Sequence, residues 1–298
     1  MTVRGKRAFA VIAACLILVN LAIFAMAFPE TSRIDSGCCV SDQPLAKDFS
    51  AYYTAAWRLF NDPAQVYFHG ALTDGEPAIL PQPQGYKYLP SFLILVSPFL
   101  SFPYGSALVA FDVLQFALLP LMAVMLYTLL KGKGFVVAVA VTALVLVLPF
   151  PLPDPNWSIS VFYFWQWAEG QCKVLDTFLL LSALTLAKSG RPRAAGVVFA
   201  LAAFDPRFAL LGAPLMIAYS KNLRTTAVYA AGALVLTNVA LFNPPTFLGF
   251  LKMVFTTGAL TPPYPYTFIP LVALILLTYV DRHAVVAALR GLGRKDYS

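Results

Sequence analysis

Residues 47–58 have the sequence KDFSAYYTAAWR, and this stretch decides how the rest of the chain is interpreted. Its spacing predicts a short amphipathic helix that begins at Phe49. Four residues share one face of this helix: Phe49, Tyr52, Tyr53 and Ala56. Asp48 stands at the N-cap position, where a carboxylate accepts hydrogen bonds from unpaired backbone N–H groups. Taken alone, Asp48 is best interpreted as a helix cap.

The surroundings of this helix give Asp48 a second interpretation. The helix lies inside a polar loop, from Glu30 to Tyr88, that is rich in acidic and aromatic residues. Almost everything after this loop is apolar. An acidic and aromatic loop held against a membrane is a setting for chemistry as well as for helix capping, so both interpretations stay open.

Composition places the chain among membrane proteins. Of its 298 residues, 59% are hydrophobic and 12% are charged, whereas soluble domains carry about twice that charged fraction. The net charge of +7 does not indicate nucleic-acid binding, because the basic residues form short clusters between apolar segments, as topology signals do. We therefore expect an all-α polytopic protein that spans the lipid bilayer of the cell membrane.

The first apolar segment covers residues 8–28 and follows Arg4, Lys6 and Arg7. Its length of about 20 residues is enough to span a bilayer. Its flanks could suit a signal peptide, but no clear small-residue cleavage site follows, so we interpret it as a first membrane helix. The positive end stays in the cytoplasm, which places the acidic loop outside.

Eight further apolar segments follow the loop. They are residues 89–102, 104–130, 135–150, 174–187, 194–204, 208–219, 225–242 and 267–280. If all basic clusters are cytoplasmic, an even number of crossings separates each cluster from the next. Three apolar segments separate Arg7 from Lys131, so one of them does not cross. Leu89–Phe102 is the candidate, because its short length and its prolines suit an interfacial or re-entrant helix.

This parity predicts about eight crossings in a single domain, residues 1–298, with both termini in the cytoplasm. Residues 30–103 then form an extracytosolic loop with interfacial helices, and residues 104–280 form the transmembrane bundle. Residues 281–298 form a cytoplasmic tail.

A break at Asp205-Pro206-Arg207 interrupts the bundle. The apolar segments on its two sides are each too short to span, so the turn should lie below the outer membrane surface. Non-helical backbone at that depth is tolerated where it is buried in protein or lines a wet cavity. A cavity that opens outward and a structural turn in which Asp205 and Arg207 satisfy each other are equally good interpretations.

The residues also limit the chemistry. Cysteine and histidine show no zinc-type spacing, and with only His69 and His283 in the chain, histidine catalysis is not expected. Cys38 and Cys39 lie in the acidic loop and Cys172 in a later loop. A disulfide could join Cys172 to one of this pair if both loops are extracytosolic, but free thiols explain the sequence at least as well.

An outward cavity with aromatic, acidic and basic residues suits an anionic lipid and a polyhydroxyl partner. Aromatic rings stack on sugar faces, and a carboxylate can act as a general base toward a hydroxyl group. An arginine can hold a phosphate with two parallel hydrogen bonds.

Several short motifs, in their order along the chain, resemble glycosyltransferase family 87, polyprenyl-phosphate-dependent mannosyltransferases of the GT-C fold, and are also similar to PIG-M mannosyltransferases. The motifs are Asp48-Phe49, Tyr52-Tyr53, Ala55-Ala56, Tyr86–Pro90 with Pro98, Asp112, Gly170-Gln171, and Arg191–Phe204 with Asp205-Pro206. The chain departs from the family at two places: Asp205 stands where the family has lysine, and Cys172-Lys173 replaces an asparagine. Asp48 also lacks the second carboxylate of an Asp-X-Asp pattern, so no metal or other cofactor is implied.

The resemblance implies a GT-C-like membrane enzyme with its catalytic loop outside. It would transfer a sugar, mannose by analogy, from a polyprenyl-phosphate donor to a hydroxyl of a glycan or glycolipid acceptor, with inversion at the anomeric carbon. Asp48 would be the general base. Arg207, together with Lys173 or Arg58, would hold the donor phosphate. The sugar site would be lined by Tyr52, Tyr88, Trp167 and Gln171. The alternative is an inactive relative, or a non-enzymatic membrane protein for assembly or transport.

Overall fold

The computed structural model describes residues 2–32, 47–67, 86–133, 135–147, 167, 170–240 and 244–257. Within these residues all regular structure is helical and no strand is present, which confirms the predicted all-α class. The predicted cytoplasmic tail and the cysteine pair of the acidic loop lie outside the described residues.

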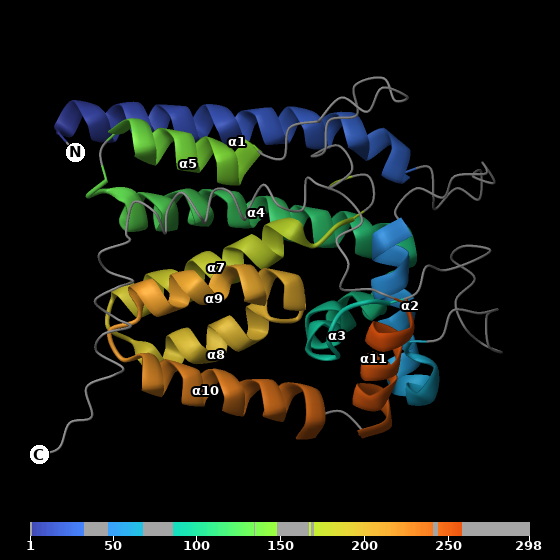
Figure 1. Ribbon diagram of the computed structural model, residues 1–298. Coiled ribbons are helices and arrows are strands. Elements are labelled where there is room, and N and C mark those ends of the chain that lie inside the picture. Colours follow the sequence, from blue (N-terminus) through green and yellow to red (C-terminus); the bar gives the residue numbers. More distant parts are fainter. Residues whose placement is uncertain are drawn as a thin grey trace, which may run out of the picture.

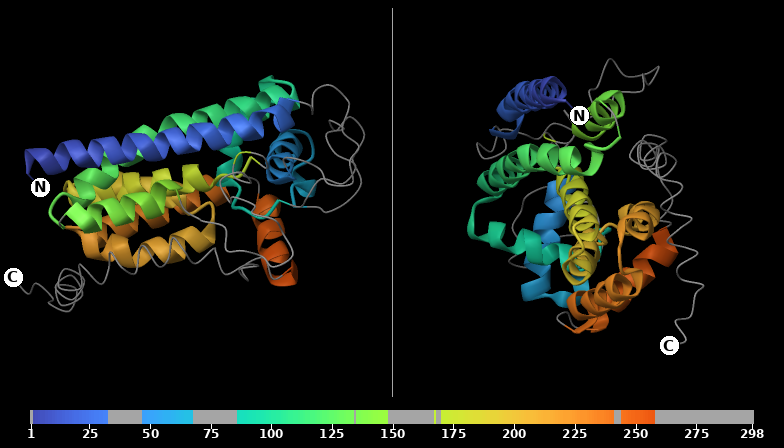
Figure 2. Two further views of the ribbon diagram at one scale, coloured as in Figure 1. Left: turned by 90° about the horizontal axis from the view of Figure 1, so that it is seen from above. Right: turned by 90° about the vertical axis from the view of Figure 1, so that its left-hand side faces the viewer.

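In the described part of the chain, seven long helices form the body of the molecule. They are α1 (Val3–Ser32), α4 (Tyr104–Leu130), α5 (Phe135–Val147), α7 (Lys173–Lys188), α8 (Pro192–Ala202), α9 (Pro206–Tyr219) and α10 (Leu223–Val235). Figure 1 shows them running roughly side by side, with α1 and α5 on one side of α4 and with α7, α8, α9 and α10 on the other. The right view of Figure 2 shows the same order of layers from the end of the bundle.

A short π-helix, η4 (Leu236–Ala240), directly follows α10. The other described helices gather at one end of this bundle. They are α2 (Lys47–Asn61), η2 (Pro63–Gln65), α3 (Ser91–Val96), η3 (Ser97–Ser101) and α11 (Pro244–Thr257). In Figure 1, α2 and α11 stand across the direction of the long helices. We call this end, with residues 47–67, 86–101 and 244–257, the capped end. The loops at residues 131–133, 189–191 and 220–222 lie at the opposite end.

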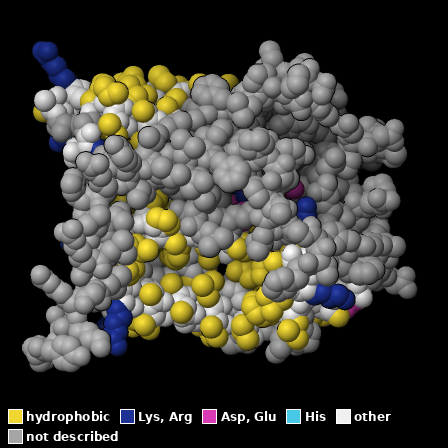
Figure 3. Space-filling view, in the orientation of Figure 1, with side chains coloured by type: hydrophobic (Ala, Val, Ile, Leu, Met, Phe, Trp, Pro, Cys, Tyr) yellow, Lys and Arg dark blue, Asp and Glu magenta, His cyan; other side chains and the backbone are white. Residues whose placement is uncertain are grey.

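Among the described residues, two helices are long and apolar enough to cross a membrane by length and composition. They comprise residues Val3–Ala22, within α1, and Tyr104–Leu130. Hydrophobic side chains cover much of the described surface in Figure 3, while charged side chains stand at its margins and in a small group near the middle. These features agree with the membrane class, and the larger count of eight crossings stays a prediction.

Helix α2 confirms the predicted periodicity. The four residues assigned to one face are all buried, with Phe49 and Ala56 fully enclosed. The predicted start is wrong by two residues, because the helix already begins at Lys47 and Asp48 lies inside its first turn. Ends of helices vary by one or two residues between assignments. In that turn Asp48 still lies near the positive end of the helix dipole, which favours a carboxylate.

The two interruptions predicted from sequence are also present. The segment between Pro90 and Phe102 is split into α3 and η3, and neither is long enough to span. Helices α8 and α9 are separated at Ala203–Asp205, and Pro206 occupies the first position of α9. Proline suits that position because its missing N–H would be unpaired there in any case.

Candidate functional site

The candidate site lies at the capped end, where the start of α7 contacts both the first turns of α2 and the turn between α8 and α9. Asp48 is partly exposed, while the residues that follow it on α2 are buried. The helix therefore holds the backbone of Asp48 in place, while the residue as a whole stays partly open to solvent. Such a position suits a general base, which has to meet a substrate.

Two of the predicted sugar-site tyrosines lie together. Tyr52 Oη lies 3.3 Å from Tyr88 Oη and 3.6 Å from Cys172 Sγ, and the two rings meet edge to face at 5.4 Å. Burial is the main cause that raises the pKa of both tyrosines well above its usual value, and the nearby Asp48 charge acts in the same direction. Both side chains therefore stay neutral hydroxyls at any working pH.

The backbone around Tyr88 is held by three distant parts of the chain. Tyr67 Oη donates a hydrogen bond to the Tyr88 carbonyl at 2.8 Å. Leu89 N donates to Phe204 O at 2.9 Å, in the turn between α8 and α9. Ser91 N donates to Asn238 Oδ1, also at 2.9 Å. Buried N–H groups need such partners, and here the partners also fix where Tyr88 points.

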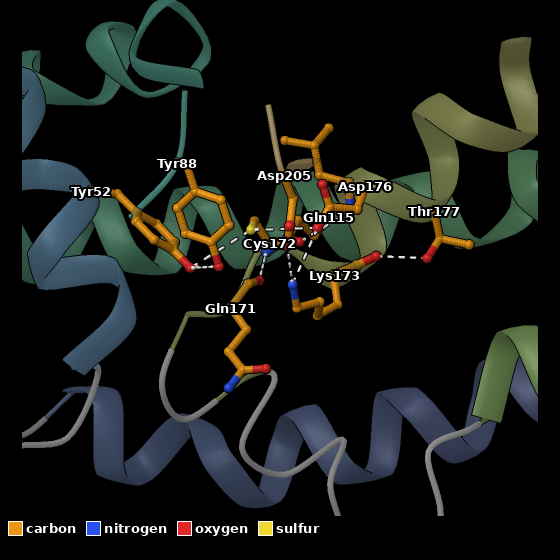
Figure 4. Close-up of polar contacts among 10 residues, drawn as sticks. Tyr52, Tyr88, Gln115, Gln171, Cys172, Lys173, Asp176, Thr177 and Asp205 are labelled. Atoms are coloured by element: carbon orange, nitrogen blue, oxygen red, sulfur yellow. Dashed lines mark hydrogen bonds and ion pairs between the residues drawn. The ribbon is translucent and has the colours of Figure 1, made fainter. Parts of the chain in front are cut away.

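Lys173 is the centre of a small charged cluster. Its Nζ lies 2.9 Å from Asp205 Oδ2 and 3.5 Å from Asp176 Oδ2. The ammonium also stands over the Tyr88 ring, 5.7 Å from the ring centre. Figure 4 shows this ammonium and the two tyrosine hydroxyls grouped around the start of α7. We call Lys173, Asp176 and Asp205 the Lys173 cluster.

Burial lowers the pKa of the Lys173 ammonium, but the negative charges of Asp205 and Asp176 more than offset this and raise the pKa well above its usual value. Lys173 is therefore a permanent cation. Its side chain is 26% exposed, whereas those of Asp205 and Asp176 are 1% and 0% exposed. Lys173 is thus the member of the cluster that an incoming anion can reach.

Gly170 sets the distance between α2 and the start of α7. Its φ of 62° lies in the left-handed region, which glycine adopts without strain. A Cβ at this position would lie 2.6 Å from both Phe49 Cβ and Leu108 Cδ1. The Gly-Gln motif is therefore a place where the backbone must pass close to the residue that follows Asp48.

The other two predicted sugar-site residues do not join this group. Trp167 is fully buried in a different apolar cluster, with Phe24 and Phe116 as ring neighbours. Gln171 uses its backbone carbonyl to accept a hydrogen bond from Gln115 Nε2 at 2.8 Å. Its side chain points away from the Lys173 cluster in Figure 4.

The two predicted arginines are placed differently. Arg58 is buried, and its Nη1 donates to the Gln65 carbonyl of η2 at 3.2 Å, so it has a structural partner inside the capped end. Arg207 lies in the first turn of α9, two residues after Asp205, and its side chain is outside the described part of the structure.

Cys172 is a buried free thiol, so of the two sequence interpretations the free thiol is the one found. Burial, followed by the Asp176 charge, raises the pKa of this thiol beyond the range in which it would ionise. Within the described residues, no group of three or more histidine, cysteine or acidic side chains could hold a metal ion.

Sequence reasoning missed Asp176 and Asn238. Asp176 stands inside a predicted membrane segment, and ionisable residues there are functional candidates by default, so the signal was present. Asn238 carried no comparable signal, because its contact with Ser91 joins positions 147 residues apart.

Comparison with known proteins gives one finding. Residues 86–292 match the model of glycosyltransferase family 87, which is more than half of the chain. The match begins at the Tyr86–Pro90 motif, so α2 and Asp48 precede it. Neither the curated proteins nor the solved structures include a significant match to this chain.

Proposed function

Since the chain belongs to glycosyltransferase family 87, we propose that this glycosyltransferase moves mannose from a polyprenyl-phosphate donor to a hydroxyl group of a glycan or glycolipid. The observation that carries the proposal is the grouping of Tyr52, Tyr88 and Lys173 at the capped end of an apolar helical bundle, with Asp48 close enough for its charge to act on both tyrosines. This end offers a reachable carboxylate, two neutral hydroxyls and a permanent cation.

Asp48 acts as the general base in this proposal. It takes the proton of the acceptor hydroxyl as the hydroxyl oxygen attacks the anomeric carbon. The bond between that carbon and the phosphate oxygen breaks, and polyprenyl phosphate leaves with the bonding electrons. A single displacement of this kind inverts the configuration at the anomeric carbon.

Lys173 balances the negative charge that grows on the departing phosphate. A cation fixed in advance near the place where charge develops is among the strongest contributions to catalysis. Arg207 follows two residues after the Lys173 partner Asp205 and is proposed as a second phosphate contact. Tyr52 and Tyr88 supply neutral hydroxyls and ring faces for the sugar.

A lipid donor suits this chain better than a nucleotide sugar. A nucleotide-sugar enzyme would usually need an α/β domain with a phosphate-binding turn, and the described residues contain no strand. A polyprenyl chain can instead lie against the exposed apolar helix faces while its phosphate reaches the capped end.

The proposed topology has eight crossings, cytoplasmic termini and an extracytosolic capped end. The basic loops at residues 131–133, 189–191 and 220–222 support it, because they share the end opposite the site and lysine and arginine favour the cytoplasmic side.

Donor competition tests the proposal directly. Purified protein in lipid nanodiscs is offered mannose as a polyprenyl phosphate, as a polyprenyl diphosphate or as a nucleotide sugar, each with the same hydroxyl acceptors. We expect transfer from the first donor only. Transfer from a nucleotide sugar in the absence of any lipid-linked sugar would refute the choice of donor, and absence of transfer from all three would favour the inactive relative.

A further inference from the structure

The turn between α8 and α9 contributes a buried carboxylate, that of Asp205, which forms an ion pair with a lysine at the start of α7. Asp205 is fully buried, and its Oδ2 lies 2.9 Å from Nζ of Lys173 across 32 positions of sequence. This is a shorter contact than the one Lys173 makes within α7, where Asp176 Oδ2 lies at 3.5 Å.

We propose that Asp205 is a positioning residue, which holds the Lys173 ammonium on the face of the Tyr88 ring so that this ammonium can meet the donor phosphate. The inference rests on the proposed function and goes further in two respects. It gives a role to Asp205, and it makes the main phosphate contact depend on a pair formed between α7 and the α8–α9 turn.

Lys173 would not hold this position by itself. It lies in the first turn of α7, and the positive end of the helix dipole disfavours a cation there. Its long side chain would also gain rotamer freedom by leaving the cluster. A fixed carboxylate that lies outside α7 overcomes both effects, and Asp205 is such a group.

The contact also directs the ammonium. Tyr88 and Asp205 lie next to Leu89 and Phe204, respectively. The backbone hydrogen bond from Leu89 N to Phe204 O, at 2.9 Å, joins these two segments. The two groups therefore keep a fixed relation to each other, and a cation bound by both has one defined place. That place is over the ring of Tyr88, whose hydroxyl meets that of Tyr52.

Two carboxylates around one ammonium would repel a phosphate if they acted alone. Each of them, however, lies at the N-terminus of a helix: Asp176 in the first turn of α7 and Asp205 directly before α9. A helix N-terminus carries about half a positive charge. Two such ends and Lys173 together balance the two carboxylates, so the cluster as a whole is close to neutral and can accept a singly charged phosphodiester.

The test compares Asp205→Asn with the wild type in nanodiscs, and Asp62→Asn serves as the matched control because Asp62 makes no side-chain cap to η2. For Asp205→Asn we expect kcat/KM for the polyprenyl-phosphate donor to fall by about 10²-fold, the effect of misplacing a catalytic group by about an ångström. The acceptor KM should stay within twofold. The control should match the wild type in both.

A pH profile separates positioning from simple support of the fold. The groups that act on Lys173 are Asp205, Asp176, Tyr88 and Cys172. Asp205→Asn removes a negative charge that raises the pKa of Lys173, while burial continues to lower this pKa. The ammonium of the variant should therefore lose its proton at a lower pH than in the wild type. The alkaline limb of the activity profile should shift to lower pH accordingly. A purely structural Asp205 would lower the melting temperature and leave this limb unchanged.

A charge exchange tests the pair itself. Lys173→Asp and Asp205→Lys each place like charges together and should be nearly inactive. The double variant restores an ion pair with the ammonium on the other helix and should recover at least tenfold over either single variant.

Binding of polyprenyl phosphate, followed by its effect on thermal stability, keeps the two proposals apart. A wild type that neither binds this lipid nor uses the donor refutes the proposed function and this inference with it. If the wild type binds the lipid and uses the donor, and Asp205→Asn has the same donor kcat/KM and the same alkaline limb, then only the role of Asp205 is refuted.

Discussion

Gly170→Ala is the substitution for which the structure makes the sharpest prediction. The left-handed φ of 62° costs an alanine about 1–2 kcal/mol. The added Cβ would also lie 2.6 Å from Phe49 Cβ and from Leu108 Cδ1, a distance at which neighbouring atoms must move. Overpacking of a filled site costs about 1–3 kcal/mol. The two terms have the same sign, so the free energy of unfolding should fall by about 2–5 kcal/mol.

The same overlap should affect turnover more than stability. Leu108 can change its rotamer, but Cβ of Phe49 moves only with the backbone of α2. The start of α7 and the first turn of α2 would therefore separate, and Lys173 would move away from Asp48. A shift of about an ångström at a reacting centre lowers the rate by about 10²-fold.

Thermal melting in detergent and donor turnover at a temperature well below the melting point measure the two effects separately. Gly232→Ala is the matched control, because nothing lies within 4 Å of a Cβ at that helical position, and alanine favours a helix over glycine by up to about 1 kcal/mol. If Gly170→Ala kept both the melting temperature and the turnover of the wild type, the close approach of α2 and α7 would not be needed.

Four further outcomes follow from the site and the proposed topology. Asp48→Asn should fold normally and lose about 10²–10⁴-fold in turnover, whereas near-normal turnover would return Asp48 to a helix-capping role. Asn238→Ala leaves a buried N–H unpaired, so it should lose about 1–3 kcal/mol of stability together with turnover; the exposed helix cap Asn222→Ala should lose stability alone. Cysteines introduced at Lys131 and Lys87 should label from opposite sides of the membrane, and labelling from one side would overturn the topology. Turnover should be unchanged by EDTA, since Asp48 has no carboxylate two residues further on with which to bind a metal ion. If EDTA abolished turnover and added metal restored it, the metal-free reaction would be contradicted.

Sequence was most informative where the structure is local. The spacing of Phe49, Tyr52, Tyr53 and Ala56 predicted the buried side of α2, because helical periodicity is contained in a dozen residues. The break before Pro206 was visible for the same reason. A helix start is less certain, since capping differs little in free energy between neighbouring residues, and α2 begins two residues early.

The site depended on contacts that a linear pattern does not contain. Lys173 and Asp205 were both noticed as departures from the family pattern, yet their pairing follows from the short length of α8, which returns the chain to the start of α7. Trp167 was chosen as an aromatic residue of a polar loop, and Gln171 as part of the Gly170-Gln171 motif. Their neighbours are set by the packing of α1, α4 and α7, so their predicted role in sugar binding has no support from their position.

The length of α10 has a consequence of its own. Helix α10 is continued directly by η4 (Leu236–Ala240), a π-helix, the form that a helix takes when it accommodates one extra residue. Before η4, α10 lies so close to α8 that a Cβ on Gly196 would overlap the backbone of Thr226 and Ala230. Within η4, Asn238 must face Ser91 in order to accept the hydrogen bond from its backbone N–H. Each residue of an α-helix turns the chain by about 100°, so a deletion that converted η4 into regular helix would turn Asn238 away or force α10 off α8. Insertions and deletions between these two contacts should therefore be absent from active relatives, however freely the surrounding loops change in length.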